Sequence, residues 1–243
     1  MLNQRAIVTG ATRGIGRVIA VRLMELGYFV EFTFIRSFEE AQRLEQEFEG
    51  RCRGMQVDSR SKESIDAYIS QITASGDPIG ALVNNAGITY DSLVKDGDWE
   101  EFQDTIETNL GGPFHFSRAL IPHMVRARKG DIIMISSLAS DNVRIGNAFY
   151  GTTKAALNRL SETLAAELAR FNIAVNIISP GFVETELIGD KLTDEKRREL
   201  LREIPIKRFT AAEEVADAVE FLLQRKPLLV GANLPLGGGG QLR

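Results

Sequence analysis

Short apolar segments alternate with helical patterns along most of the chain. The apolar runs that predict buried strands are 6–8, 29–34, 55–57, 81–83, 132–135, 174–178 and 228–236. Between them, Ile15, Ile19, Leu23 and Leu26 recur at the spacing of one helical face. The other predicted helices cover 38–48, 64–72, 99–128, 150–170 and 211–223.

This alternation is typical of repeated β-α-β units, which form a parallel sheet with helices on both faces. The sequence therefore predicts a doubly wound α/β fold of the Rossmann type. No linker, repeat or low-complexity segment divides the chain, so we expect one domain over 1–243. Gly111-Gly112-Pro113 is expected to interrupt the longest helical stretch, and Gly237–Gly240 is expected to be a flexible tail.

Composition narrows the class of protein. The 243 residues are 44% hydrophobic with a formal net charge of -4, which gives no general affinity for nucleic acid or anionic membranes. The single cysteine, Cys52, excludes an intramolecular disulfide, and with only His115 and His123 beside it we expect no metal site. No signal peptide or membrane-spanning run is recognisable, so a cytoplasmic enzyme is expected.

A glycine-rich turn lies between the first predicted strand and helix, in the sequence Thr9-Gly10-Ala11-Thr12-Arg13-Gly14-Ile15-Gly16. Glycine is needed here because a β-carbon would keep the backbone away from a pyrophosphate, which the free N–H groups of a helix start would bind. A glycine turn alone is weak evidence, but its place in an amino-terminal β-α-β unit indicates dinucleotide binding.

The end of the second predicted strand indicates which dinucleotide binds. A site for NAD usually places an acid there, whereas Thr33-Phe34-Ile35-Arg36-Ser37 carries none and has one arginine. Arg13 could face the same 2′-phosphate, although either arginine alone could be a surface charge. Together they favour NADPH. Asp58, after the third strand, is placed either to contact adenine or to serve as a turn or helix-cap residue.

Tyr150 and Lys154 are four residues apart and so share one helix face. A nearby ammonium favours the phenolate, so we expect Lys154 to lower the pKa of Tyr150 and make it a general acid for a carbonyl oxygen. Ser137 is expected at the end of the fifth strand, and Asn109 could anchor a water that links Lys154 to solvent. Such a Tyr–Lys pair is common on ordinary helices, and the upstream glycine turn is what favours the catalytic interpretation.

These motifs together resemble the short-chain dehydrogenase/reductase family over essentially the whole chain. They include Asn84-Asn85-Ala86-Gly87, Pro180-Gly181 and the thirteen-residue spacing from Ser137 to Tyr150. The resemblance implies a seven-stranded Rossmann fold, a homotetramer, and a mobile substrate lid at about 186–208. It also implies a catalytic set of Asn109, Ser137, Tyr150 and Lys154. The implied cofactor contacts are Gly10, Thr12, Arg13, Gly14, Ile15, Gly16, Arg36, Asp58, Asn85, Ala86, Gly87, Tyr150, Lys154, Pro180, Gly181, Val183 and Thr185.

Within the family, Asn85-Ala86-Gly87-Ile88-Thr89 and Glu107-Thr108-Asn109-Leu110 are similar to bacterial 3-oxoacyl-acyl-carrier-protein reductases. That likeness implies NADPH-dependent reduction of a β-ketoacyl thioester on an acidic acyl carrier protein. Four basic residues are expected near the opening of the site, where they could dock the carrier or be ordinary surface charges: Arg126, Arg128, Lys129 and Arg170.

Two departures from the reductase pattern fall where the substrate is expected. The loop 138–147 lacks some of the usual glycines, and Phe149 precedes Tyr150. The acyl chain length and the pathway, fatty-acid or polyketide-type biosynthesis, therefore stay open. Two other functions are also open: a reductase or dehydrogenase acting on a free small ketone or alcohol, and a non-catalytic scaffold or nucleotide sensor. The intact set of Ser137, Tyr150 and Lys154 argues against the last of these.

Overall fold

A computed structural model describes residues 4–183, 193–224 and 229–242. Its sheet has seven strands, all parallel, in the order β3-β2-β1-β4-β5-β6-β7. The predicted doubly wound Rossmann fold is confirmed. The strands are β1 (Gln4–Val8), β2 (Tyr28–Phe34), β3 (Cys52–Gln56), β4 (Ile79–Asn84), β5 (Gly130–Ile135), β6 (Ile173–Pro180) and β7 (Asn233–Leu236).

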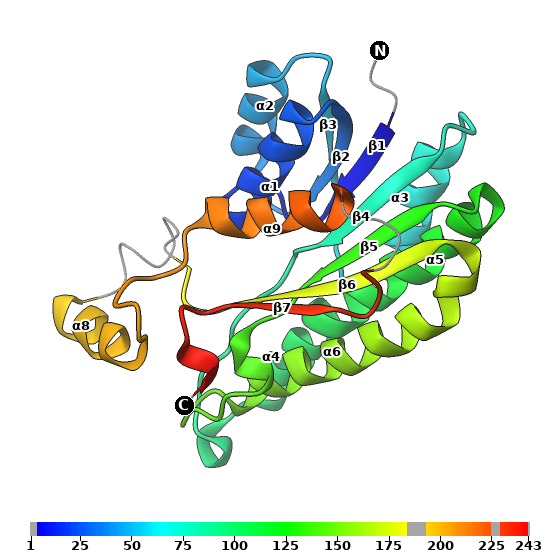
Figure 1. Ribbon diagram of the computed structural model, residues 1–243. Helices are drawn as coiled ribbons and strands as arrows, with labels where there is room; N and C mark the ends of the chain where they lie inside the picture. The colour runs from blue at the N-terminus through cyan, green and yellow to red at the C-terminus, as the bar shows by residue number, and fades with distance from the viewer. Residues whose placement is uncertain (1–3, 184–192, 225–228, 243) are drawn as a thin grey trace.

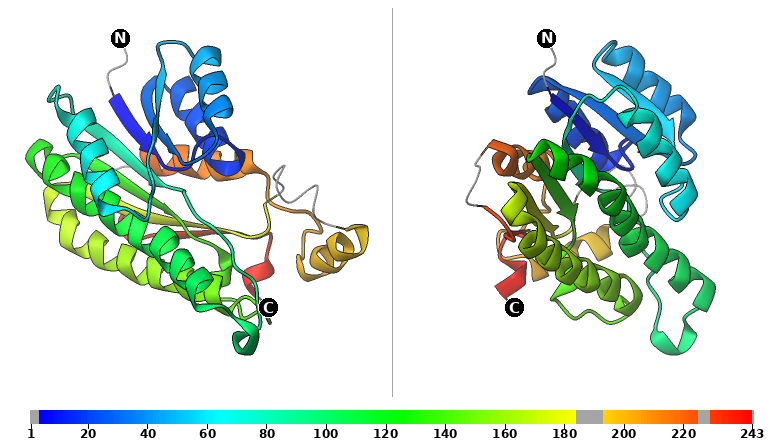
Figure 2. Two further views of the ribbon diagram at one scale, coloured as in Figure 1. Left: turned by 180° about the vertical axis from the view of Figure 1, so that it is seen from behind. Right: turned by 90° about the vertical axis from the view of Figure 1, so that its right-hand side faces the viewer.

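Helices cover both faces of this sheet (Figures 1 and 2). One face carries α1 (Gly14–Glu25), α2 (Phe38–Glu47) and α9 (Ala212–Gln224), whose apolar residues share one core. The other carries α3 (Lys62–Thr73), α4 (Trp99–Ile106), α5 (Gly112–Ala127) and α6 (Ala148–Leu168). Short turns at η1 (Val94–Asp96), η3 (Leu138–Ser140), η4 (Ala169–Phe171) and η5 (Gly240–Leu242) link or end these elements, and α8 (Asp194–Glu203) stands off the end of the sheet.

The strands are apolar on both sides because both faces of the sheet are covered. In β1, Ala6 and Val8 point into the core under α1 and α9, whereas Ile7 points into the core under α3 and α5. All three side chains are fully buried. The apolar run at 6–8 therefore serves two cores, as expected of a parallel strand in the interior of a sheet.

The longest predicted helix is interrupted at Asn109 and Gly111, as expected, but not at Gly112 and Pro113. A π-helical turn, η2 (Glu107–Gly111), joins α4 to α5, and Gly112 and Pro113 begin the second helix instead of breaking the first. Proline is tolerated there because the first turn of a helix lacks N–H acceptor partners anyway. The interruption places Asn109 inside the π turn and fully buried.

The carboxyl-terminal segment differs from prediction. The last strand covers only Asn233–Leu236, and residue 228 lies outside the described residues. The glycines after it are packed, which corrects the expected flexible tail: the Ile206 N–H donates to the Gly238 carbonyl at 3.3 Å. A β-carbon on Gly237 would overlap Leu138, and one on Gly239 would lie 3.0 Å from Pro205. Glycine here permits close packing beside the cleft.

Candidate active site

A cleft of about 1620 Å³ runs along the carboxyl ends of the strands, where ligands of open α/β sheets bind. Its cofactor half is lined by the glycine turn, the ends of β2 and β3, and residues 85–87 after β4. Its substrate half is lined by residues 88–91, the loop 138–147 (hereafter the substrate loop), residues 181–182 and α8. The predicted site residues that line the cleft are Gly10, Thr12, Arg13, Gly14, Ile15, Gly16, Arg36, Asn85, Ala86, Gly87, Ser137, Tyr150, Lys154, Pro180, Gly181 and Val183.

The glycine turn has the backbone that an anion cradle requires. Gly10 and Gly14 have φ values of +65° and +53°, which side chains with a β-carbon rarely adopt. A β-carbon on Gly16 would overlap the Gly10 carbonyl and the Asn85 amide. Helix α1 begins after Arg13, whose side chain does not cap the helix. The first N–H groups of α1 therefore receive no hydrogen bond acceptor from a capping side chain and are available to a ligand in the cleft. These features fit a dinucleotide pyrophosphate.

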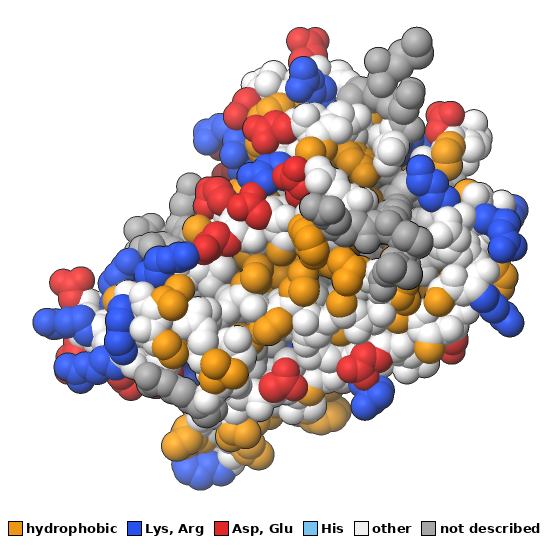
Figure 3. Space-filling view, in the orientation of Figure 1, with side chains coloured by type: hydrophobic (Ala, Val, Ile, Leu, Met, Phe, Trp, Pro, Cys, Tyr) orange, Lys and Arg blue, Asp and Glu red, His pale blue; other side chains and the backbone are white. Residues whose placement is uncertain are grey.

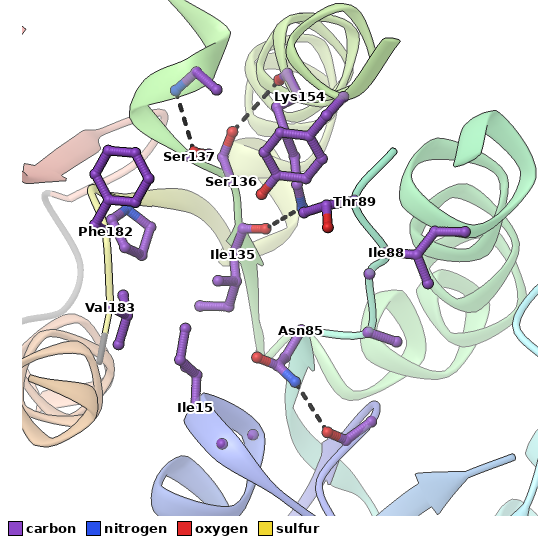
Figure 4. A pocket seen from close by; sticks show the side chains of 18 of the residues that line it. Ile15, Asn85, Ile88, Thr89, Ile135, Ser136, Ser137, Lys154, Phe182 and Val183 are labelled. Atoms are coloured by element: carbon purple, nitrogen blue, oxygen red, sulfur yellow. Dashed lines mark hydrogen bonds between the residues drawn. The ribbon is translucent and has the colours of Figure 1, made fainter. Parts of the chain in front are cut away.

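Asn85 ties this turn to the end of β4. Its Nδ2 donates to the carbonyls of Thr9 at 2.9 Å and Gly10 at 3.1 Å (Figure 4). In return, the Thr9 hydroxyl accepts the N–H groups of Asn85 and Ala86, each at 2.9 Å. The segment 84–87 thus fixes the position of the cradle through side chain–backbone hydrogen bonds, so the two motifs act as one unit.

Three arginines stand at the far end of the cofactor half. The two predicted ones, Arg13 and Arg36, are exposed and line the cleft. Sequence reasoning missed Arg60, which also lines the cleft and could have been noticed because it follows β3 at the same edge of the sheet. Arg60 pairs with Asp58 at 2.9 Å and with Asp104 at 2.9 Å.

Asp58 takes the second of its two predicted roles. Its Oδ1 accepts the Arg60 N–H at 2.9 Å, and its carbonyl accepts the Ser61 N–H, so it builds the turn before α3. The hydrogen bond from Arg60 lowers the pKa of its carboxyl. The Asp58 carboxylate is held by Arg60, and the adenine contact expected for it stays a prediction.

Ser137, Tyr150 and Lys154 meet where the two halves join. Ser137 lies two residues beyond β5, where its Oγ accepts the Ala139 N–H at 3.1 Å and caps η3. The Lys154 Nζ donates to the Ile135 carbonyl at 2.9 Å and lies 5.7 Å from the centre of the Tyr150 ring (Figure 4). The turn after β5 and helix α6 therefore bring a hydroxyl, a phenol and an ammonium to one point.

The pKa of Tyr150 shifts in the direction opposite to the prediction. Burial raises it, a hydrogen bond with Ser137 opposes the rise, and the negative charge of Asp91 adds to it. Lys154 is itself buried, and desolvation lowers its pKa to about 8. A half-hidden phenol next to a desolvated ammonium thus remains protonated at neutral pH, which is the form that can donate a proton.

Asn109 lies behind the cleft and does not line it. Its Oδ1 accepts the Ile88 N–H at 2.8 Å, while its Nδ2 donates to the Ile88 carbonyl at 2.8 Å and to the Thr153 hydroxyl at 3.1 Å. Its side chain therefore holds the segment after β4 against α6, one residue before Lys154. The water link between Asn109 and Lys154 stays a prediction.

The substrate half contains residues that sequence reasoning did not single out. Leu200 and Ile204, at the end of α8, line it beside Phe182. Basic side chains gather over α8 in Figure 3, and the sequence of this helix includes Lys196 and Arg197. The expected lid at about 186–208 is only partly described, since residues 184–192, including Thr185, lie outside the described residues.

Phe149 does not face the cleft, contrary to expectation. Its ring stacks on Tyr90 with centroids 5.1 Å apart and packs against Phe102 at 5.0 Å. Gly97 makes room for it, because a β-carbon there would overlap the Phe149 ring. The aromatic residue before Tyr150 thus anchors α6 to α4 and to the segment after β4, and does not limit the substrate directly.

The four basic residues expected at the opening are elsewhere in this chain. Arg126, Arg128 and Lys129 precede β5, and Arg170 precedes β6. Since the cleft lies at the carboxyl ends of these strands, one strand length of roughly 20 Å separates them from it. The Arg128 guanidinium reaches the Arg170 carbonyl at 3.4 Å, so two of the four are neighbours, but none lines the cleft.

The fold and this cleft define a dinucleotide-dependent oxidoreductase, and the family comparison agrees. The short chain dehydrogenase model matches residues 4–196, and the chain belongs to this family of enzymes. It is 34% identical over 242 residues to the 3-oxoacyl-[acyl-carrier-protein] reductase FabG of Staphylococcus epidermidis, covering 98% of this chain and 99% of that one. It is 37% identical over 235 residues to FabG of Escherichia coli, covering 96% of each.

Solved structures agree with the fold. ElxO, in a structure with NADP bound, superposes with a TM-score of 0.93 at 26% identity over 99% of this chain and 100% of that one. A short-chain type dehydrogenase/reductase from Mycobacterium ulcerans also gives 0.93 at 26% identity, over 99% of this chain and 90% of that one. Family members use NAD or NADP. In the described part of the chain, no helix is long and apolar enough to cross a membrane.

Proposed function

We propose that this enzyme reduces a β-ketoacyl thioester carried on an acyl carrier protein to the 3-hydroxyacyl product, using NADPH. The observation that carries the proposal is the meeting of Ser137, Tyr150 and Lys154 beside a glycine cradle, in a chain 34–37% identical to FabG reductases over nearly its full length. The activity of those relatives suggests the substrate class.

The three polar side chains have different roles in the proposed reaction. Tyr150 donates its proton to the carbonyl oxygen as negative charge develops there. The Ser137 Oγ accepts from Ala139 and is hydrogen-bonded to the Tyr150 phenol, and its hydroxyl proton can turn to the same substrate oxygen when that oxygen lies between them. Lys154, held by the Ile135 carbonyl, places a positive charge near the phenolate that proton transfer leaves behind.

NADPH, when bound, supplies the hydride. In the proposed site the cradle of Gly10, Gly14 and Gly16 holds the pyrophosphate on the first N–H groups of α1. Arg36 and Arg13 face the 2′-phosphate, since both are exposed cations at the end of the cleft and no acid ends β2. Lys154 holds the nicotinamide ribose, as in the family.

A second function is favoured by one observation. The basic residues expected to dock an acidic carrier, Arg128 among them, lie a strand length from the cleft of this chain. A reductase for free small ketones would need no such docking surface. The homotetramer remains a prediction, and an assembly could change which surfaces flank each cleft.

Steady-state rates decide between these substrates. Acetoacetyl-acyl carrier protein should be reduced with a kcat/KM at least about tenfold above that of the matched N-acetylcysteamine thioester and of ethyl acetoacetate, because the carrier adds binding energy outside the reacting group. The preference should weaken at high salt if charge steers docking. Equal kcat/KM values for carrier-bound and free ketones would replace the first function with the second.

A further inference from the structure

Asp91 lies in the substrate half of the cleft and is not one of the three side chains that the proposed reaction uses. It follows β4 in the segment that Asn109 holds, and its half-exposed carboxylate lines the cleft. Its two oxygens have different partners. Oδ1 accepts the Asn147 side-chain N–H at 2.6 Å, and Oδ2 accepts an Arg144 N–H at 3.1 Å.

Both partners belong to the substrate loop, which leads directly into α6. The Ser92 N–H also donates to the Gly146 carbonyl at 2.8 Å, so residues 91–92 and 144–147 are joined by three hydrogen bonds. One carboxylate therefore clamps a loop that lies more than fifty residues away in sequence.

Asn147 occupies the N-cap position of α6, yet its side chain caps no N–H of the helix. Its carbonyl accepts the Gly151 N–H at 2.9 Å, while its side chain is committed to Asp91. Since Tyr150 is in the first turn of this helix, Asp91 fixes the start of the element that carries the tyrosine. The carboxylate also sits at the positive end of the helix dipole, where a negative charge is stabilised.

Among the residues that the structure describes, Lys154 approaches the Tyr150 phenol from its own helix, and the charge of Asp91 acts on it from the segment after β4. Ser137 faces the phenol as a neutral hydrogen-bond partner. Burial raises the pKa of Tyr150, and the Asp91 charge adds to the rise. Arg144, the ion-pair partner of Asp91, also packs its guanidinium 5.3 Å from the centre of the Phe182 ring.

We propose that Asp91 is a positioning residue for Tyr150: through Asn147 and Arg144 it anchors the start of α6, the helix that carries the tyrosine, and it places a negative charge on the wall of the cleft that the tyrosine also lines. This inference rests on the proposed role of Tyr150 as the acid. A phenol is the form required for ketone reduction, whereas alcohol oxidation requires the phenolate. The Asp91 charge therefore extends to higher pH the range in which the proton-donating form of Tyr150 persists.

The test separates charge from anchoring. Asp91→Asn keeps an oxygen for Asn147 but removes the charge, and it also leaves Arg144 without its counter-charge. The alkaline limb of the pH profile for ketone reduction should move down by about half a pH unit, the effect of one partly screened charge. Asp91→Ala removes the anchor as well and should lower kcat by about tenfold.

A readout without turnover distinguishes failure of this inference from failure of the proposed function. The chain has four tyrosines, so ¹³Cζ-tyrosine labelling gives four signals, and Tyr150→Phe identifies one of them. In Asp91→Asn the titration midpoint of that signal should fall by the same half unit. Asp96→Asn, which breaks the exposed pair with Lys95 in the same segment, is the matched control and should shift nothing. An unchanged Tyr150 midpoint in Asp91→Asn, or an equal shift in Asp96→Asn, overturns the inference whether or not any ketone is reduced.

Discussion

The cofactor half of the cleft is walled by the ends of neighbouring strands, whereas the substrate half is walled by segments that leave the sheet. In the first, Thr9, Asn85 and the glycine turn hold one another through short side chain–backbone hydrogen bonds. In the second, contacts such as Asp91–Arg144 and the apolar residues of α8 join segments far apart in sequence. Substitutions in the first should therefore change cofactor affinity, and those in the second should change turnover.

The two halves also differ in what they expose. The glycine turn has buried neighbours, and the ends of β1 and β4 are fully covered. The substrate loop leaves Val143 and Ile145 at its tip almost fully exposed. Exposed apolar side chains at a cleft mouth are available to bind a ligand or a partner, which is consistent with a substrate half that adapts and a cofactor half that does not.

The largest effect is expected at the junction of the halves. Tyr150→Phe should reduce NADPH-dependent ketone turnover by about 10²–10⁴-fold, the usual contribution of a general acid. NADPH affinity, measured by fluorescence titration, should change little, because the phenol ring stays in place. Turnover close to that of the unchanged enzyme would remove Tyr150 from the acid role.

Lys154→Met should abolish turnover and yet stabilise the protein without cofactor. Burial lowers the pKa of Lys154 from 10.5 to about 8, so below pH 8 the folded state carries a desolvated charge. Removing it should raise the free energy of unfolding by on the order of 2–3 kcal/mol at pH 7. The unfolded chain binds more protons between pH 8 and 10.5, so the stability of the unchanged protein rises with pH and the difference shrinks there.

Thermal unfolding at pH 7 and pH 10 measures this effect. Lys62→Met is the control, because Lys62 is exposed and pairs only at the surface with Asp66. If Lys154→Met unfolds at a lower temperature than the unchanged protein at pH 7, the hydrogen bond to Ile135 outweighs the burial of the charge.

Arg36→Ala tests the cofactor half. Loss of a charged hydrogen bond to the 2′-phosphate should weaken NADPH binding by roughly 10–100-fold and leave NADH binding nearly unchanged. Arg43→Ala, an exposed arginine on α2 outside the cleft, should affect neither nucleotide. Equal losses for NADPH and NADH would exclude Arg36 from the phosphate site, and Arg60 would be the next residue to test.

The smallest effect is expected from Gly97→Ala. Gly97 lies behind the substrate half and contacts Phe149. The new β-carbon would overlap the Phe149 ring, which must move and carry the start of α6 with it. We expect a loss of about three- to tenfold in kcat/KM for the ketone with NADPH affinity unchanged. Gly80→Ala, whose β-carbon would meet its nearest atom at an ordinary 3.7 Å, is the control. If Gly97→Ala changed NADPH affinity instead, the expectation that the two halves of the cleft respond separately to substitution would be wrong.

Sequence patterns predicted the fold and the cofactor half because both depend on local rules. A parallel strand needs an apolar run, and a phosphate cradle needs glycines at fixed spacing. The substrate half depends on pairings such as Asp91 with Asn147, which periodicity does not reveal. The same limit applies to two other residues. The sequence did not reveal that the Asp58 carboxylate pairs with Arg60. It also did not show that Arg128 lies at the amino end of β5, away from the cleft, because that depends on which end of the strands the cleft occupies.

The prediction that Lys154 lowers the pKa of Tyr150 was wrong for a related reason. Spacing placed Lys154 one turn away, but the shift depends on how far both groups are removed from solvent. Burial is a property of the assembled sheet and helices, and it exceeded the local effect of the pair.

The π turn at Glu107–Gly111 has a consequence for insertions and deletions. A π turn contains one residue more than the α-helical turn that it replaces, and each residue rotates a helix by about 100°. Helices α4 and α5 are therefore one rod whose two ends are out of phase: α4 packs on α6, and α5 packs on α3. Deleting a single residue within 107–111 would bring the two ends into phase and turn the apolar side of α5 away from the sheet. The length of the turn thus sets which side of α5 faces the sheet. At positions other than the buried Thr108 and Asn109, this short stretch should tolerate substitutions far better than changes of length.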